Sequence, residues 1–227
     1  MKTYNVVKKL ALGAALCGLV ALNASAIIAY DNTGVVQNQS TGGPYALGND
    51  FTVNQSIMIT AIGAFDNGGA MVASVPVAIY NMANNTIVSG TLVTLLQGTT
   101  GDFTANGSAF MNIAPVTLGP GTYSIVAANY GQDGEPYWWN HSPQGTEPGF
   151  NDGGGLITLG GGRWASPNTG LTFPGSTVGP TPGIPTYAAG TFEFTPVPET
   201  AVFATASVAL LGLVYIGRYT VRKQKQA

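Results

Sequence analysis

The stretch Gly121–Tyr130 (GTYSIVAANY) decides the fold class of this chain. It is rich in β-branched and aromatic residues, and it directly follows the turn sequence Leu118–Gly121 (LGPG). Such a run after a Gly-Pro turn predicts a β-strand. In Val75–Tyr80 the odd positions are all valine or isoleucine, so they share one face of a second strand. Further strand-like runs stand at Ile57–Phe65, Ile87–Leu96 and Thr191–Thr195 (TFEFT).

The segments between these runs contain clusters of Gly, Asn, Asp and Pro, and we find no helical period among them. A parallel sheet would require crossover helices. We therefore expect an all-β fold, an antiparallel β-sandwich or jelly-roll ectodomain over residues 27–195. Within it, the Gly- and Pro-rich residues 131–190 are expected to form a long surface excursion before the closing strand at 191–195.

Charge is strongly segregated along the chain. Of 227 residues only 8% are charged, and 45% are hydrophobic. Between residues 27 and 195 one basic residue, Arg163, stands against nine acidic residues, a net charge of −8. The other basic residues lie at the two ends. This distribution predicts weak affinity for anionic lipid surfaces and no nucleic-acid partner.

The N-terminal residues 1–26 read as a secretory signal peptide. An apolar run, Leu10–Leu22, follows a basic start and precedes small residues at Ala24 and Ala26. Cleavage there would make Ile27 the first residue of the mature chain. The alternative is an uncleaved membrane anchor. The only cysteine, Cys17, lies inside the apolar run, so the mature chain would have no disulfide and no thiol. The basic residues before the run are Lys2, Lys8 and Lys9.

The C-terminal residues carry a second set of signals, which we assign to residues 196–227. The motif at 196–200 (PVPET) precedes an uncharged apolar segment, 201–217, and a basic tail, 218–227. The apolar segment is at the short limit of a spanning helix, about 17 residues. Basic residues stay on the cytoplasmic side of a membrane, so the acidic body would face outward. The motif residues are Val197, Pro198, Glu199 and Thr200, and the bases that would stop and orient the helix are Arg218, Arg222, Lys223 and Lys225.

This order of motif, apolar helix and basic tail resembles the PEP-CTERM sorting signal of exported proteins from biofilm-forming Gram-negative bacteria. The resemblance covers about residues 196–225 and departs from the family at Thr200, where a second proline is usual. It implies an exosortase-type peptidase as partner, transient anchoring, and transfer to the cell envelope or extracellular matrix. The alternative is a permanent single-pass anchor. Residues 44–130 also resemble small exported β domains of unknown function, in the phrases Tyr45–Val53, Ala61–Asp66, Pro76–Tyr80 and Leu118–Ala127.

Catalytic chemistry finds little support in the sequence. His141 is the only histidine, and no serine lies in a Gly-x-Ser-x-Gly elbow, so a nucleophilic triad is not expected. No phosphate-binding loop is present. A glycoside hydrolase would need two facing carboxylates, which spacing alone cannot establish. We therefore expect a non-enzymatic protein without a required cofactor, and keep a carbohydrate-active hydrolase as a distant alternative.

Calcium is the metal best suited to the acidic, Gly-rich loops. Extracellular calcium sites use carboxylate, amide and backbone oxygens. The alternative is ordinary turn chemistry, because Asp-Gly and Asn-Gly sequences are common in turns. A second such sequence is Asp66–Gly69. The candidate calcium ligands are Asp133, Glu135, Asn151 and Asp152.

Aromatic residues cluster in the loop-rich stretch after Tyr130. Aromatic rings among amides and carboxylates are typical of pockets that bind sugars. The alternative is that the tryptophans close the end of the sandwich. The candidate glycan contacts are Tyr137, Trp138, Trp139 and Trp164. Taken together, the sequence predicts an exported structural protein of the cell surface or exopolysaccharide matrix, with a lectin-like glycan-binding module as the main alternative and extracellular polysaccharide as a candidate partner.

Overall fold

The computed structural model describes residues 25–35, 43–66, 69–131, 134–136, 138–139, 147–167 and 170–197. Ser25–Val197 forms one compact unit with its own core. The signal-peptide assignment up to Ala24, the motif from Pro198 onward, the apolar segment 201–217 and the basic tail lie outside the described residues. Within the described ranges there is no helix, and so none that could cross a membrane.

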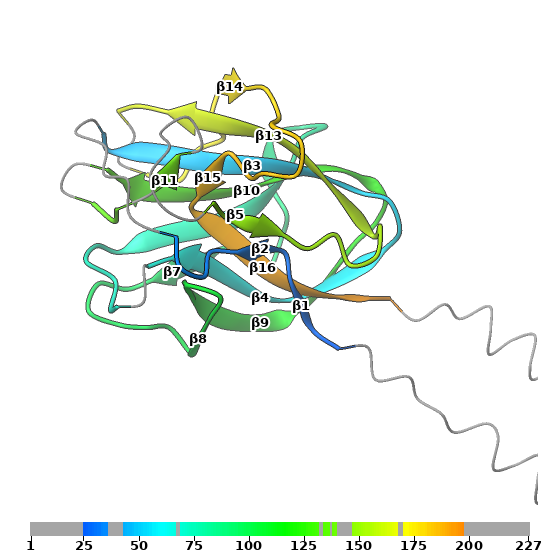
Figure 1. Ribbon diagram of the computed structural model, residues 1–227, viewed down its shortest axis with the longest axis horizontal. Helices are drawn as coiled ribbons and strands as arrows, with labels where there is room; N and C mark the ends of the chain where they lie inside the picture. The colour runs from blue at the N-terminus through cyan, green and yellow to red at the C-terminus, as the bar shows by residue number, and fades with distance from the viewer. Residues whose placement is uncertain are drawn as a thin grey trace, which may run out of the picture. The chain divides into compact units, whose positions relative to one another are not determined.

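Two antiparallel sheets face each other, and Figure 1 shows them as two layers. We call the first one sheet I. It has five strands. Its longest strand, β9, contains Pro115 and pairs with β4 through a β-bulge. In spatial order the strands of sheet I are β1 (Ile27–Ile28), β16 (Gly190–Pro196), β4 (Ile57–Phe65), β9 (Ser108–Leu118) and β8 (Phe103–Ala105).

The second sheet, sheet II, has seven strands with β3 and β10 at its centre. The long strands β3 and β10 pair over nearly their whole length. In spatial order the strands are β14 (Ser176–Val178), β13 (Ile157–Ala165), β3 (Tyr45–Val53), β10 (Gly121–Tyr130), β5 (Val75–Asn81) and β6 (Thr86–Ile87), with β7 (Val93–Leu95) pairing with β5 beside β6.

Two short ribbons complete the fold. The ribbon of β2 (Tyr30–Asp31) and β12 (Gly149–Phe150) brings the first described segment against residues more than a hundred positions later. The ribbon of β11 (Trp138–Trp139) and β15 (Tyr187–Ala188) is tied to sheet II. The side chain of Asn49 on β3 makes that tie, because its amide donates to the carbonyl of Tyr187 at 2.8 Å and its oxygen accepts from the Tyr187 N–H at 3.1 Å.

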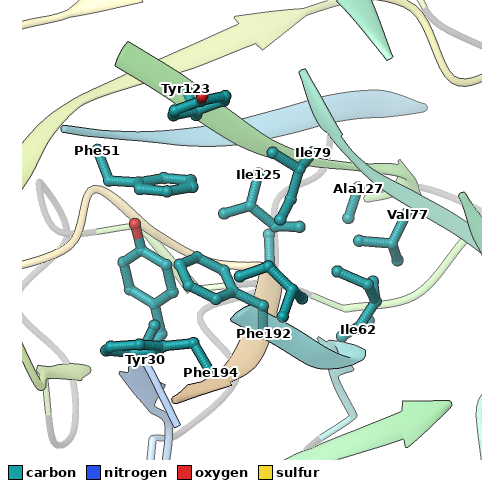
Figure 2. Close-up of a cluster of buried hydrophobic side chains, with 14 of the residues drawn as sticks. Tyr30, Phe51, Ile62, Val77, Ile79, Tyr123, Ile125, Ala127, Phe192 and Phe194 are labelled. Carbon is teal, nitrogen blue, oxygen red and sulfur yellow. The ribbon is translucent and has the colours of Figure 1, made fainter. Parts of the chain in front are cut away.

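The core lies between the two sheets, and aromatic rings fill its centre (Figure 2). Phe192 from β16 is fully buried, with its ring centroid 4.7 Å from that of Phe51 on β3 and 6.0 Å from that of Tyr30. Phe51 in turn stacks on Tyr123 of β10 at 5.8 Å. Rings from both sheets therefore interlock around β16, the last strand of the unit.

The strand assignments made from sequence are confirmed at most positions. Ile57–Phe65 and Gly121–Tyr130 are strands with those same ends, and the odd positions of Val75–Tyr80 face the core as expected. The run Ile87–Leu96 is not one strand. It is divided into β6 and β7 because Gly90 adopts a φ of 85° and the Thr91 hydroxyl donates to the carbonyl of Val88 at 2.8 Å.

The expected surface excursion over 131–190 contains a strand of sheet II. β13 pairs along β3 from Ile157 to Ala165, so these residues belong to the sheet and not to a surface loop. Three consecutive glycines, 160–162, suggested a loop, but each stands where a Cβ would have no room. At Gly160 it would meet Asp50 at 2.9 Å, and at Gly162 it would meet Thr186 at 2.4 Å. A bulge between Leu159 and Gly162 absorbs the irregularity.

The outer face of sheet II carries a small third layer. Tyr80, Val126 and small alanines form a buried cluster there, and Leu171 and Phe173 pack over it. The Tyr80 hydroxyl donates to the carbonyl of Leu171 at 3.3 Å, and the rings of Tyr80 and Phe173 lie 5.5 Å apart. The segment around 171–173 therefore acts as a cover that removes this part of the sheet from water.

We expect Phe192→Ala to lower the free energy of unfolding of residues 25–197 by about 3–5 kcal/mol, because it empties the centre of the core. Urea unfolding followed by fluorescence measures this. The control is Thr117→Ala, at an exposed position on β9, which is expected to change the free energy by less than about 0.5 kcal/mol. Equal effects of the two variants would contradict the assigned role of Phe192.

Candidate functional site

Glu135 joins two loops at the end of the sandwich where β10 finishes. Its side chain belongs to a residue only 1% exposed, and Oε2 accepts hydrogen bonds from the N–H groups of Val72 at 2.8 Å and Ala73 at 3.3 Å. The backbone around it is also fixed, because the Glu135 N–H donates to the carbonyl of Asn129 at 2.8 Å. Glu135 is therefore a structural tie between the residues before β5 and those after β10.

Burial raises the pKa of the Glu135 carboxyl to about 7. The two backbone N–H donors pull this pKa down, and the neighbouring negative charge of Asp66 pushes it up. The protonated form is therefore favoured by the fold over a range in which an exposed glutamate is ionised. Glu135 changes charge near neutral pH at a place where that charge is desolvated.

Asn151 and Asp152 lie elsewhere and have a different role. Each caps its own turn, since Asn151 Oδ1 accepts from the Gly153 N–H at 3.0 Å and Asp152 Oδ1 accepts from the Gly154 N–H at 2.8 Å. Both side chains are exposed. These hydrogen bonds match the turn chemistry that was the alternative to calcium binding.

The three candidate calcium ligands that the structure describes make separate contacts. Gly153 lies against Phe194 on β16, whereas Glu135 neighbours Tyr130, whose hydroxyl donates to the carbonyls of Phe65 and Ala189. Asp133 lies outside the described residues, and the described ones contain no group of three His, Cys, Asp or Glu that could hold a metal.

A hollow of about 290 Å³ lies beside the β2–β12 ribbon. Phe150 supplies an apolar wall and is fixed by Tyr30, whose ring centroid lies 5.5 Å away. Carboxylates and amides supply the polar wall. A half-buried aromatic ring among carboxylates and amides is a suitable lining for a hydroxyl-rich ligand. The hollow is lined by Ile28, Asp31, Asn106, Gly149, Phe150, Asn151 and Asp152.

Sequence reasoning missed Asp31 and Asn106 as members of this site. Asp31 faces Gly149 across the ribbon, and the carbonyl of Asn106 accepts from the N–H of Asn32 at 2.9 Å. Both contacts join residues far apart in the chain. The one local signal is Asn106 itself, because an asparagine before glycine commonly adopts the left-handed conformation found here, with a φ of 50°.

Of the candidate glycan contacts, Trp164 is the one whose side chain the structure describes. It is 38% exposed on β13, directly opposite Leu47, and its ring meets that of Tyr45 edge to face at 6.4 Å. Trp138 and Trp139 form the strand β11, whose backbone pairs with β15 at the same end of sheet II. Tyr137 lies outside the described residues.

Arg163 is the single basic residue between residues 27 and 195, and it is engaged. Its Nε donates to Asp50 Oδ1 at 2.8 Å, and its guanidinium lies 4.8 Å from the centre of the Phe173 ring. Burial raises the pKa of Asp50, while hydrogen bonds from Arg163 and Ser124 lower it. The pair therefore stabilises the outer face of sheet II, and its cation is not presented to an anionic ligand.

No protein-family model matches the chain, and no curated protein matches it either. Among solved structures, a chain from the structure of infectious bursal disease virus Gt strain aligns with it at a TM-score of 0.24 and 12% sequence identity. The alignment covers 86% of this chain and 51% of the viral one, so this chain spans about half the length of that protein. A similarity of this size supports no conclusion about fold or function.

We expect Glu135→Gln to remove part of the pH dependence of stability. A carboxyl whose pKa is raised by folding holds its proton more tightly in the folded state, so wild-type stability falls as the pH rises from about 4.5 to about 7. The melting temperature of the variant should fall less over this interval. The control is Glu147→Gln, at an exposed position, which should follow wild type. Parallel curves for wild type and Glu135→Gln would refute the assignment.

Proposed function

We propose that this chain is an exported, non-enzymatic structural protein of the cell surface or exopolysaccharide matrix, sorted by its C-terminal segment. The observation that supports it best is the position of the two ends of the folded unit. Ile27 on β1 pairs with Phe194 on β16, and the Val197 N–H donates to the carbonyl of Ser56 at 3.2 Å. Figure 1 shows the first and last coloured segments leaving the sandwich at the same end.

This arrangement suits a body that is tethered by its C-terminus. The last residue of the folded unit, Val197, is directly followed by Pro198 and Glu199 of the sorting motif. Proline disfavours helix, so the motif would be held extended between the sheet and an apolar helix at 201–217. An exosortase-type peptidase would then act on an extended segment next to the membrane. The basic tail from Arg218 would stay on the cytoplasmic side.

An acidic body is also suited to a secreted environment. With a net charge of −8 and its single cation paired to Asp50, the unit would stay soluble and avoid nucleic acids and anionic lipids. The core needs no disulfide, because two sheets of five and seven strands enclose it.

Removal of residues 201–227 should release the protein. We expect the full chain, expressed with a tag in place of residues in an exposed loop, to fractionate with membranes or the envelope. The truncated chain should be recovered from the soluble exported fraction. Replacement of Pro198 and Glu199 by alanine, with the helix kept, is the matched control and should retain membrane association but slow processing. A full chain recovered from the cytosol with both Met1 and Ala227 intact would refute export.

Binding of glycans is the second candidate function, and the hollow beside Phe150 is the observation that favours it. An aromatic wall, two amides and two carboxylates surround a space just below the usual range for small-ligand sites, about 300–1,000 Å³. Trp164 on β13 is a separate exposed aromatic side chain, outside the lining of the hollow. A carbohydrate-active hydrolase stays a distant alternative, since Asp31 and Asp152 line the same hollow.

A neutral oligosaccharide that binds residues 25–197 on a glycan array should lose about tenfold in affinity in the variant Asn106→Gly. Glycine suits the left-handed φ at this position and removes only the amide. Phe150→Leu, which keeps apolar packing against Tyr30, should have a similar effect. The control is Thr158→Ala, at an exposed position on β13. Binding that is lost only in Trp164→Ala would move the site to sheet II, and release of shortened sugars would favour the hydrolase.

A further inference from the structure

The hollow beside the β2–β12 ribbon carries negative charge that the folded unit does not neutralise. Two of its lining residues, Asp31 and Asp152, have carboxylates, and none of the lining residues is basic. Arg163 is the only basic residue between residues 27 and 195, and it is bonded to Asp50 of β3 in sheet II. Within the described ranges, no cation of the protein itself therefore pairs with the carboxylates of the hollow.

Each of the two carboxylates is held in place through one of its oxygens. Asp31 Oδ1 accepts from the N–H of Thr33 at 2.9 Å, and Asp152 Oδ1 accepts from the N–H of Gly154 at 2.8 Å. In the part of the chain that the structure describes, the second oxygen of each carboxylate accepts no hydrogen bond. An ionised carboxylate can only accept, so these two oxygens are available to donors that a ligand brings.

A third carboxylate lies beside the hollow. Ile28, one of the lining residues, pairs directly with Glu193 of β16. Residues directly opposite each other on antiparallel strands project to the same face of the sheet, so the Glu193 side chain is a neighbour of Ile28. It is fixed there by the hydroxyl of Thr60, which donates to Glu193 Oε1 at 2.6 Å. A concave surface lined by charges of one sign attracts ligands of the opposite charge.

The shape of the hollow depends on a glycine. Gly149 stands opposite Asp31 across the ribbon, and a Cβ atom at this position would lie 3.4 Å from Asp31 Cβ. The missing side chain leaves the space beside Asp31 open. Phe150 then supplies an apolar wall, and the amides of Asn106 and Asn151 also line the space. An apolar wall with polar groups around it suits the C–H face and the hydroxyls of a sugar ring.

We infer that this hollow binds amine-bearing sugars, with the ammonium group of the sugar donating to the carboxylates that line it. The inference rests on the glycan-binding candidate described above and names its class of sugar. An ammonium group brings three donors and a positive charge, whereas a hydroxyl at the same place brings one donor and no charge. Acidic sugars are repelled by the same carboxylates. Among sugars of one shape, the affinity therefore falls from amine-bearing to neutral to acidic.

Calorimetric titration of residues 25–197 with two matched trisaccharides tests this order. The probes are a glucosamine trimer and a glucose trimer of the same linkage. At about pH 6, where an amine carries its proton, the glucosamine trimer should bind about tenfold or more tightly than the glucose trimer. Added salt should reduce this preference, because it screens the attraction between the ammonium and the carboxylates.

Single charge-removing variants locate the preference. Asp31→Asn and Asp152→Asn keep an oxygen that can accept from the N–H of each turn, but remove the charge. Each should lower the preference for the glucosamine trimer by about threefold or more and change the affinity for the glucose trimer little. The matched control is Asp102→Asn, which removes an exposed charge outside the lining and should keep the preference. Gly149→Val, which fills space without changing charge, should weaken the binding of both trimers.

A measurement on wild type keeps the test valid if a variant fails to fold. In NMR titrations, the backbone amides of Asp31, Asn106 and Asn151 should shift when the glucosamine trimer is added. Equal affinities for the two trimers would overturn the inference and leave glycan binding standing. Failure of the glucosamine trimer to bind would also overturn it. So would shifts confined to other residues, or a preference that Asp102→Asn lowers as much as Asp31→Asn, because either result would place the site elsewhere.

Discussion

Burial of Phe192 and Phe194 by the last strand is the interaction on which the rest of the structure depends. β16 pairs with β1 on one side and β4 on the other, and its two phenylalanines reach Tyr30, Phe51 and the core of sheet II. The contacts join residues from both ends of the folded unit, so the core cannot close until the chain is complete to about Phe194. The sequence PVPET at 196–200 begins two residues later. The strand that closes the sandwich is thus continuous with the start of that sequence.

Charge and polarity are distributed in a way that fits this architecture. The one cation of the unit is used inside the fold, where Arg163 pairs with Asp50 beneath Phe173. The Glu135 carboxyl is also used inside the fold, where it accepts hydrogen bonds that join two loops. The remaining acidic groups give the body its net negative charge. A net negative charge disfavours the approach of polyanions.

Strands whose residue pattern is local could be predicted from the sequence. Val75–Tyr80 alternates and Gly121–Tyr130 is rich in β-branched and aromatic residues, and the lack of segments that could form crossover helices favours antiparallel pairing. β13 was not predicted because Gly160 and Gly162 are typical loop residues. In the structure, neighbouring residues leave no room for a Cβ atom at either position. The role of Glu135 and the hollow beside Phe150 also depend on distant residues. Only the φ preference of Asn106 gave a local indication. These features depend on pairing between residues far apart in the chain, which a local sequence pattern does not contain.

The most direct test of the closing role of β16 is amide hydrogen exchange across residues 25–197 under native conditions. If β16 completes the core, the amides of Phe192 and Phe194 should exchange as slowly as the central amides of β4 and β10, through unfolding of the whole unit. If these two amides exchange much faster while β4 and β10 stay protected, the sandwich is stable without its last strand. The account of a core closed by β16 would then be wrong.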